Sequence, residues 1–328
     1  MNLAAFALLL AILLDFAIGD PRYPFHPVRL IGHLITRMER FLRSRKSATY
    51  LGGIILWSIA QAIPIALFAA LYYGFHHIPG ASFAFSTFVV YSCLGMGDLI
   101  RHAKPIADAL ARSNIAYARE RVSWIVGRDV SRLDESGIAR ATVESVSENF
   151  VDAFLAPVFW FAAGSIAGDW LGLPPLWGGT AAILAYRITN TLDAMVGYRN
   201  ERFLEIGCAS ARMDDALNFI PARFSIPLIS LAAQLSGNRA IDALRVGWRD
   251  RNHHPSPNSA HAESATAGAL GISLGGPTPY AHGVVEKPWL NDGAPAPESS
   301  DILRTNRLCT VSAIIGGGFA LALLLLLI

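Results

Sequence analysis

The feature that most limits how this chain can fold is a series of long apolar stretches. The clearest covers residues 308–328, which hold no charged residue and end in a run of leucines. Residues 52–73 are similar, with only Gln61 and Pro64 as polar or helix-breaking interruptions. A helix needs about 20 apolar residues to cross the hydrocarbon core of a bilayer. The sequence therefore predicts an all-α, polytopic integral membrane protein.

The overall composition agrees with a membrane protein. Charged residues make up 16% of the chain and hydrophobic residues 53%, with a mean hydropathy of +0.39. Soluble domains carry about 25% charged residues, so a soluble globule and a disordered chain are both excluded. The net charge of only +2 argues against a nucleic-acid-binding protein. Cys93, Cys208 and Cys309 lie too far apart in the sequence to form a zinc motif or a disulfide framework.

The apolar stretches and the basic residues together predict a topology. The stretches expected to cross the membrane are 2–18, 52–73, 81–97, 153–167, 171–186 and 308–328. A seventh, 220–235, contains two prolines and an arginine, so we expect it to be re-entrant or interfacial. All 27 Lys and Arg residues fall in four segments, namely 19–51, 100–149, 187–223 and 236–307. Because Lys and Arg gather on the cytoplasmic side, these segments are predicted to be cytoplasmic parts of one membrane domain, 1–328.

The strongest chemical signal is a row of acids where a predicted cytoplasmic helix enters the membrane. Glu144, Glu148 and Asp152 are spaced i, i+4 and i+8, so they share one face of a helix, with Asn149 beside them. Acids at a membrane entry are costly unless they are compensated. Carboxylates are hard oxygen ligands that suit Mg²⁺, which usually also binds substrate phosphates. The alternative is a solvated acidic face balanced by neighbouring arginines.

Two pairs of polar residues follow the predicted spans. Asp20 and His26 lie in a proline-rich turn after the first span, where Asp20 could bind a metal ion or cap the next helix. Asn190 and Asp193 are one helical turn apart where the fifth span ends, and they offer a pair of hard oxygen ligands. Ordinary helix capping is the alternative for this second pair.

Two further groups combine polar residues of different kinds. Asp214 and Asp215 are flanked by Arg212 and Arg223, which suits binding of a metal ion together with phosphate. The alternative is a surface salt-bridge cluster. The second group, His254, Ser256, Asn258 and Glu263, belongs to a loop with two prolines and to the helix that we expect at 259–264. A helix N-terminus binds anions through its unpaired N–H groups, and a flexible loop is the alternative.

Six stretches, in order over nearly the whole chain, resemble the CobD/CbiB family of cobalamin biosynthesis, the adenosylcobinamide-phosphate synthases. They read DFAIGDPRYPFHPVRLIG (15–32), GRDVSRLD (127–134), VESVSENFVDAFLAPVFW (143–160), NTLDAMVGYRNERFLEIG (190–207), ARMDDALNFIPAR (211–223), and HPSPNS (254–259) with GALGISLGGPTPY (268–280). Six motifs in order are a specific signal. The chain departs from the family after HPSPNS, where Ala260-His261-Ala262-Glu263 stands in place of Gly-Trp-Pro-Glu.

The resemblance implies a polytopic helical enzyme that forms an amide at the expense of ATP. The free propionate carboxylate of adenosylcobyric acid would join (R)-1-aminopropan-2-ol or its O-phosphate. ATP would be a cosubstrate used with Mg²⁺, and the corrinoid would be a substrate rather than a cofactor. The implied location is the inner (plasma) membrane, with the active site on the cytoplasmic side. The expected partners are membrane lipid and other enzymes of the pathway, but not nucleic acid.

The resemblance also assigns the polar residues to roles. The expected catalytic residues are Glu148, Asp152, His254 and Asn258. The residues expected to bind the nucleotide are Glu144, Asn149, Arg199, Arg212, Arg223 and Ser256. Those expected to bind the other substrates are Asp20, His26, Asn190, Asp193 and Glu263. The expected metal ligands are Glu144, Glu148, Asp152, Asp214 and Asp215.

Two other functions stay open on the residues alone. A Mg²⁺-dependent membrane transferase acting on a lipid-linked or CDP-alcohol substrate would also use clustered acids at the inner face. A transporter would place ionisable residues near the middle of the bilayer. No G-x-x-x-x-G-K-[ST] or G-x-S-x-G motif occurs in the sequence, so a P-loop and a serine hydrolase of the nucleophile-elbow type are excluded.

Overall fold

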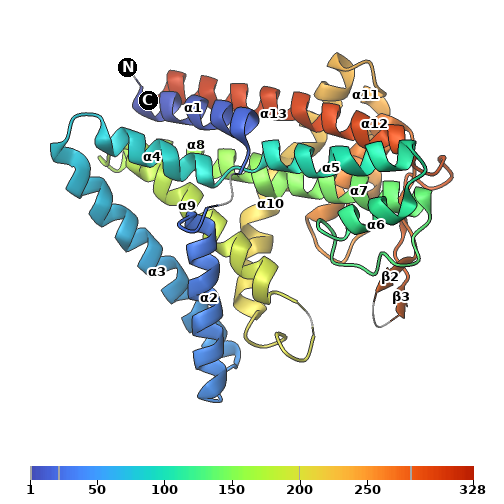
Figure 1. Ribbon diagram of the computed structural model, residues 1–328. Coiled ribbons are helices and arrows are strands. Elements are labelled where there is room, and N and C mark those ends of the chain that lie inside the picture. The colour runs from blue at the N-terminus through green and yellow to red at the C-terminus, as the bar shows by residue number, and fades with distance from the viewer. Residues whose placement is uncertain (1, 21–22, 199, 281–282) are drawn as a thin grey trace. The chain divides into compact units, whose positions relative to one another are not determined.

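The structure is a computed structural model that describes residues 2–20, 23–198, 200–280 and 283–328. Helices form most of the described chain (Figure 1). The chain divides into two compact units, each of which contains more than one segment. Unit 1 comprises Met1–Gly95, Ala156–Leu217 and Gly317–Ile328, and unit 2 comprises Met96–Leu155 and Asn218–Gly316.

Unit 1 is built around a central helix, α9 (Pro175–Val196). The helices that pack against α9 are α1 (Leu3–Ile18), α2 (Pro27–Ser44), α3 (Tyr50–Gly74), α4 (Ala81–Ser92) and α8 (Ala156–Trp170). A short 3₁₀ turn, η1 (Phe75–His77), follows α3. Unit 1 also contains the first part of α10 (Cys208–Leu235) and the last part of α13 (Ser299–Leu327). The tight α8–α9 hairpin agrees with the sequence, which predicted two consecutive helices there.

Glycines allow α8 and α9 to touch backbone to backbone. A Cβ added at Gly178 would lie 2.5 Å from the carbonyl oxygen of Gly164 and 3.1 Å from the Cα of Gly168. Small residues that permit such close approach are typical of helix pairs in membranes, where dispersion contacts drive association. The α8–α9 contact therefore depends on the absence of a side chain at these positions.

A methyl group at Gly178 should weaken this hairpin. We expect Gly178→Ala to lower the free energy of unfolding by about 1–3 kcal/mol, because overpacking forces the two helices apart. Thermal unfolding in detergent measures the loss. Gly74→Ala is the matched control, since nothing lies within 4 Å of a Cβ added at Gly74. Equal unfolding midpoints for the two variants would contradict this account of the hairpin.

Unit 2 combines helices with two small strand pairs. Its helices are α5 (Met96–Ala111), α6 (Ile115–Val122), α7 (Glu135–Phe150), the π-helical turn η2 (Val151–Leu155), α11 (Ala240–Asp250), α12 (Ser259–Leu270) and parts of α10 and α13. The strands are β1 (Leu274–Gly275), β2 (Thr278–Tyr280), β3 (Gly283–Val285) and β4 (Trp289–Leu290), paired antiparallel as β1–β4 and β2–β3.

Helix α12 forms the core of unit 2. Every one of its residues is buried, and it packs against both α7 and α11. Its sequence, SAHAESATAGAL, consists mostly of Ala, Ser and Gly, whose small side chains let neighbouring helices approach closely. The helix begins at Ser259, as the sequence predicted. The residues of the HPSPNS loop therefore lead directly into the most buried helix of the unit.

The predicted all-α membrane fold is confirmed by a mostly helical structure, with differences in the individual spans. In the described residues, five helical segments are long and apolar enough to cross a membrane: Tyr50–His77, Ala81–Ala111, Glu135–Trp170, Cys208–Leu235 and Ser299–Leu327. Leu3–Ile18 is a shorter apolar helix. The predicted span 171–186 lies largely in α9, which is not one of the five. The segment 220–235, predicted to be re-entrant or interfacial, belongs to an unbroken helix of 28 residues despite Pro221 and Pro227.

Candidate active site

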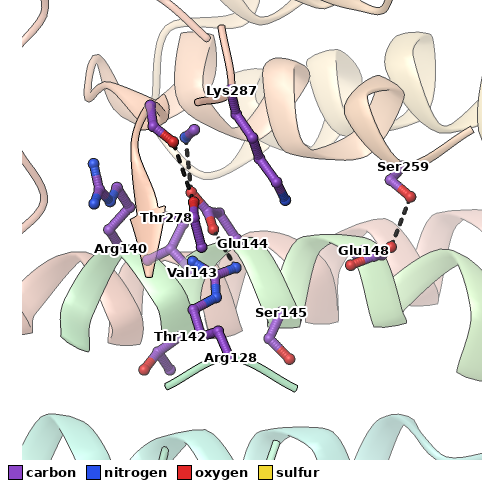
Figure 2. A network of polar contacts seen from close by, with 12 residues as sticks. Arg128, Arg140, Thr142, Val143, Glu144, Ser145, Glu148, Ser259, Thr278 and Lys287 are labelled. Carbon is purple, nitrogen blue, oxygen red and sulfur yellow. Dashed lines mark hydrogen bonds and ion pairs between the residues drawn. The ribbon is translucent and has the colours of Figure 1, made fainter. Parts of the chain in front are cut away.

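The carboxylate of Glu144 is a paired, buried group in unit 2. Its Oε2 accepts a hydrogen bond from Arg128 Nη2 at 2.7 Å, and its Oε1 accepts one from the backbone N–H of Gly275 at 2.7 Å (Figure 2). The side chains of Arg128 and Glu144 are only 12% and 6% exposed. Glu144 on α7 therefore holds the loop that carries Arg128 and the strand β1 in place.

Glu148 lies one helical turn after Glu144 on α7. Its Oε1 accepts a hydrogen bond of 2.6 Å from the hydroxyl of Ser259, the first residue of α12. Figure 2 shows Lys287 pointing toward α7, with Glu144 and Glu148 on the helix beneath it. Glu148 thus joins the start of α12 to α7 and stays partly exposed.

Asn149 and Asp152 follow Glu148 along the chain. Asn149 turns back along α7, where its amide nitrogen donates to the carbonyl oxygen of Ser145 at 2.8 Å. Asp152 lies in the π-helical turn η2, where each turn takes more residues than in an α-helix. Asp152 therefore follows Glu148 across a change of helix type, which the α-helical i, i+4, i+8 spacing did not anticipate.

The HPSPNS loop brings several predicted residues of unit 2 together. The backbone N–H of Ser256 donates to Nδ1 of His254 at 3.1 Å, and the Ser256 hydroxyl accepts from the N–H of Asn258 at 3.3 Å. Arg223 Nη1 donates to Asn258 Oδ1 at 3.4 Å. On the other side of the imidazole, Nε2 of His254 lies 3.3 Å from Nζ of Lys287. The loop is thus an ordered structure with defined internal contacts.

The imidazole of His254 is held in its neutral form. Burial lowers the pKa of His254, and the Lys287 cation lowers it further, although the nearby carboxylates of Glu148 and Glu144 oppose the shift. Because Nδ1 accepts the N–H of Ser256, the neutral ring carries its proton on Nε2, facing Lys287. A role as general base at Nδ1 therefore requires the Ser256 hydrogen bond to break.

Glu263 is a third carboxyl group at this place, and it is 4% exposed within α12. Burial raises the pKa of Glu263 well above its usual range, and the charges of Glu148 and Glu144 raise it further. Lys287 and Arg128 act in the opposite direction. With Glu263 protonated, the two anions Glu144 and Glu148 are balanced by the two cations Arg128 and Lys287. We call these five residues the charged cluster.

Unit 1 brings other predicted residues into pairs. Nε2 of His26 lies 2.8 Å from Oδ1 of Asp20, so the predicted neighbours in the first loop do meet. The alternative role of Asp20 as a helix cap is wrong, because α2 begins at Pro27 with His26 as its N-cap. The amide nitrogen of Asn190 donates to Oδ1 of Asp214 at 3.3 Å, which links α9 to α10.

The remaining predicted residues of unit 1 are less informative. Asp193 lies near the end of α9, and its backbone oxygen accepts the N–H of the C-cap residue Gly197. Arg212 is exposed on α10, and Asp215 on the same helix is partly exposed. Arg199 lies outside the residues that the structure describes.

Comparison with known proteins identifies the family. A family model described as CobD/Cbib protein matches residues 8–309, which is most of the chain. The chain belongs to the CobD/CbiB family. No solved structure matches the chain.

Similar proteins of the CobD/CbiB family occur in several bacteria. The chain is 40% identical over 310 residues to the Salmonella typhi protein named cobalamin biosynthesis protein CbiB, covering 93% of this chain and 92% of that one. It is 41% identical over 307 residues to the Klebsiella pneumoniae cobalamin biosynthesis protein CobD, covering 92% and 91%. A Pelobacter propionicus protein named cobalamin biosynthesis protein CobD is 42% identical over 288 residues, covering 87% and 84%.

Two contributors to the site of this CobD/CbiB protein were missed by reasoning from the sequence. Lys287 contacts His254, and the backbone N–H of Gly275 contacts Glu144. Arg128, one of the arginines that the sequence offered as balancing charges, is a direct partner of Glu144. Lys287 is one of only three lysines in the chain, and this scarcity was the one feature of the sequence that could have drawn attention to it. Neither its place beside His254 nor the role of Gly275 follows from any local pattern.

The residues of the site limit how the Mg²⁺ expected from the CobD/CbiB resemblance could be held. Within the part of the chain that the structure describes, no three His, Cys, Asp or Glu side chains form a group that could hold a metal ion. Both oxygens of Glu144 already accept hydrogen bonds. A cage of three protein carboxylates therefore does not fit. Mg²⁺ held by one or two carboxylates together with substrate phosphates and water would fit, and Glu148 would then be the protein ligand.

A buried histidine makes the stability of this CobD/CbiB protein sensitive to acid. His261 on α12 is fully buried, and its Nδ1 lies 3.2 Å from the carbonyl oxygen of Asn258, which can only accept. Nδ1 therefore carries the ring proton. Burial lowers the pKa of His261 from 6.5 to about 4, and the positive charge of Arg223 contributes to the shift. The folded protein therefore holds this imidazole in its neutral form.

We expect the free energy of unfolding to fall as the pH is lowered from 6.5 to about 4. The unfolded chain binds the proton first, so stability present above pH 6.5 is lost in that window, by at most about 3 kcal/mol from His261. His261→Leu should flatten the pH dependence of the unfolding midpoint between these values. The same slope in wild type and variant would contradict the assignment.

Proposed function

We propose that this protein acts in cobalamin biosynthesis as an ATP-dependent ligase of the adenosylcobinamide-phosphate synthase type. It joins the free propionate carboxylate of adenosylcobyric acid to (R)-1-aminopropan-2-ol or its O-phosphate. The observation that carries the proposal is the family match over residues 8–309, together with relatives that are named cobalamin biosynthesis proteins. The charged cluster supports it, because the cluster supplies the kinds of group that such a reaction needs.

The reaction requires activation of the carboxylate, which is not electrophilic enough to react with an amine. In the proposed first step, a carboxylate oxygen of the corrinoid acid attacks the terminal phosphorus of ATP and ADP leaves. In the second step, the amine nitrogen attacks the acyl carbon, inorganic phosphate leaves, and the nitrogen loses a proton. Bound Mg²⁺ supplies charge neutralisation for the transferred phosphoryl group.

Lys287 and His254 suit the binding of an anionic oxygen. The positively charged Nζ of Lys287 and the N–H at Nε2 of His254 are both donors, and they lie 3.3 Å apart. Two N–H donors that face each other repel. An anionic oxygen that accepts a hydrogen bond from both of them removes this repulsion. We assign this position to an oxygen of the transferred phosphoryl group or of the substrate carboxylate. Arg223, beside Asn258, is a further cation for a phosphate group.

The same site gives the carboxylates separate roles in the proposed mechanism. Glu148 is the metal ligand, and Glu144 is a positioning residue because Arg128 and Gly275 already bind both of its oxygens. The raised pKa of Glu263 favours its neutral form, which limits the negative charge of the charged cluster before the substrates bind. The proposal also keeps Asp152 and Asn258 as catalytic residues. It keeps His254 as the base that takes the proton from the amine.

An isotope experiment tests the activation step. Adenosylcobyric acid labelled with ¹⁸O in its free carboxyl group should yield inorganic phosphate that carries one ¹⁸O atom for each amide formed. Transfer of no label would contradict the acyl-phosphate route. Running the reaction with aminopropanol and with its O-phosphate identifies the amine. A transferase would instead consume a lipid-linked or CDP-alcohol substrate, and a transporter would form no covalent product.

A further inference from the structure

Helix α11 borders a basic groove that lies apart from the charged cluster. The groove has a volume of about 190 Å³, and its charged lining residues are Arg239, Asp242, Arg245 and Arg249. Three arginines against one aspartate give this lining a formal charge of +2. Val246, Gly268 of α12, its C-cap residue Gly271 and Asn291 complete its walls. The proposed ligase reaction assigns no role to these residues.

One of the arginines is held by hydrogen bonds, and a second lies against the end of α12. Arg249 donates from Nε and Nη2 to the two carboxylate oxygens of Asp250 at 2.7 and 2.8 Å. Asp250 is 2% exposed and also accepts the backbone N–H of Asn291 at 2.8 Å. The guanidinium of Arg239 lies against Gly271, where an added Cβ would be 2.7 Å from Nη1. The groove therefore contains one preorganised guanidinium group, that of Arg249, beside the guanidinium of Arg239.

The positive charge of the groove is only partly neutralised. Among the residues that the structure describes, neither Arg239 nor Arg245 forms an ion pair. Guanidinium groups present several N–H donors in one plane and match the oxygens of a phosphate group. The chemistry of the groove therefore fits a phosphate group.

A stripe of exposed apolar side chains runs along α11 beside these arginines. Ile241, Leu244 and Trp248 are 82%, 41% and 43% exposed. Their spacing of i, i+3 and i+7 places them on one side of the helix, next to Arg245 and Arg249. A helix with an exposed apolar side and an adjoining basic side is typical of helices that lie in a membrane interface.

The same region contains the ends of two candidate membrane spans. In unit 2, α11 follows the last residue of α10, Leu235, after a short turn. Arg304, in the first turns of α13, donates to Oδ1 of Asn238 in that turn at 3.2 Å and to the carbonyl oxygen of Leu270 at 3.4 Å. Leu235 is also exposed. The groove therefore lies beside the ends of two helices, α10 and α13, that are long and apolar enough to cross a membrane.

We propose that this groove binds the phosphate of an anionic phospholipid. The arginines contact the headgroup, and the stripe of Ile241, Leu244 and Trp248 contacts the acyl chains at the membrane surface. Basic residues near a membrane surface are each worth about 1 kcal/mol of attraction to anionic lipids. The site is independent of the ligase reaction, so binding rather than activity is the quantity that tests it.

The experiment compares three ligands on the purified full-length protein in detergent. Short-chain phosphatidylglycerol, short-chain phosphatidylcholine and inorganic phosphate are titrated, and bound lipid is counted by native mass spectrometry. We expect phosphatidylglycerol to bind more tightly than the other two. Arg245→Ala, and more strongly Arg239→Ala/Arg245→Ala, should weaken its binding by about tenfold or more, the effect of losing a charge-assisted contact. Arg112→Ala, an exposed arginine elsewhere in unit 2, is the matched control.

A variant of the apolar stripe separates the lipid from free phosphate. Ile241→Ser should weaken the binding of phosphatidylglycerol and leave that of inorganic phosphate unchanged. Equal binding of phosphatidylglycerol and phosphatidylcholine would overturn the proposal, as would unchanged binding by the folded double variant. Inorganic phosphate that binds as tightly as phosphatidylglycerol would also overturn it, since the groove would then be a site for a soluble anion.

Discussion

Glu148→Gln should fold and insert normally but lose ATP-dependent activity by about 10²–10³-fold. Glutamine keeps a side-chain oxygen that can accept the hydrogen bond from Ser259, so the junction between α7 and α12 is preserved. The substitution removes the carboxylate charge of Glu148. In the proposed mechanism, that charge binds the Mg²⁺ that neutralises the transferred phosphoryl group. The effect should appear in kcat, because the charge acts most strongly on the transition state.

A matched control on the same helix separates this effect from a change of helix or of net charge. Glu135 lies in the first turn of α7 and is exposed. Glu135→Gln should retain wild-type activity and the wild-type unfolding midpoint. Wild-type activity in folded Glu148→Gln would remove Glu148 from the catalytic machinery.

Arg128→Ala should lower the free energy of unfolding by about 3–5 kcal/mol. Removal of one partner of a buried ion pair leaves the other charge buried and uncompensated, and this costs far more than the pair itself contributes. The uncompensated group here is Glu144, whose side chain is 6% exposed. Of the two donors to the Glu144 carboxylate, Arg128 and Gly275, only the backbone N–H of Gly275 would remain.

Two further variants test the cause of that loss. Arg132→Ala, an exposed arginine of the same loop, should change stability little. The double variant Arg128→Met/Glu144→Leu should recover much of the stability, because apolar side chains of similar volume replace both charges. Chemical or thermal unfolding in detergent measures all three variants. A loss for Arg128→Ala no larger than that for Arg132→Ala would show that the ion pair is not a structural element.

Local patterns in the sequence predicted the helical framework well. Apolar stretches of membrane length marked most of the helices, and the HPSPNS loop marked the start of α12 at Ser259. These predictions succeed because helix formation and membrane insertion depend on residues that are neighbours in the sequence. The same reasoning placed Glu144 and Glu148 on one face of one helix.

The partners of these acids could not be predicted in the same way. Glu144 meets Gly275, which is 131 residues away, and Glu148 meets Ser259, which is 111 residues away. Such pairings depend on how α7, α12 and β1 pack, and no local periodicity specifies them. The π-helical turn at Asp152 is a second limit, because an α-helical spacing rule does not anticipate a local change of helix type.

The most direct test of the proposed function is coupled ADP release by the purified protein with Mg²⁺ and ATP. Adenosylcobyric acid is supplied with aminopropanol O-phosphate and, separately, with aminopropanol, and the corrinoid product is followed by mass. The proposal predicts one ADP for each amide formed with one of the two amines, and no ADP release without the corrinoid acid. ADP release without the amide product, or no reaction of folded protein with either amine, would contradict the proposed ligase.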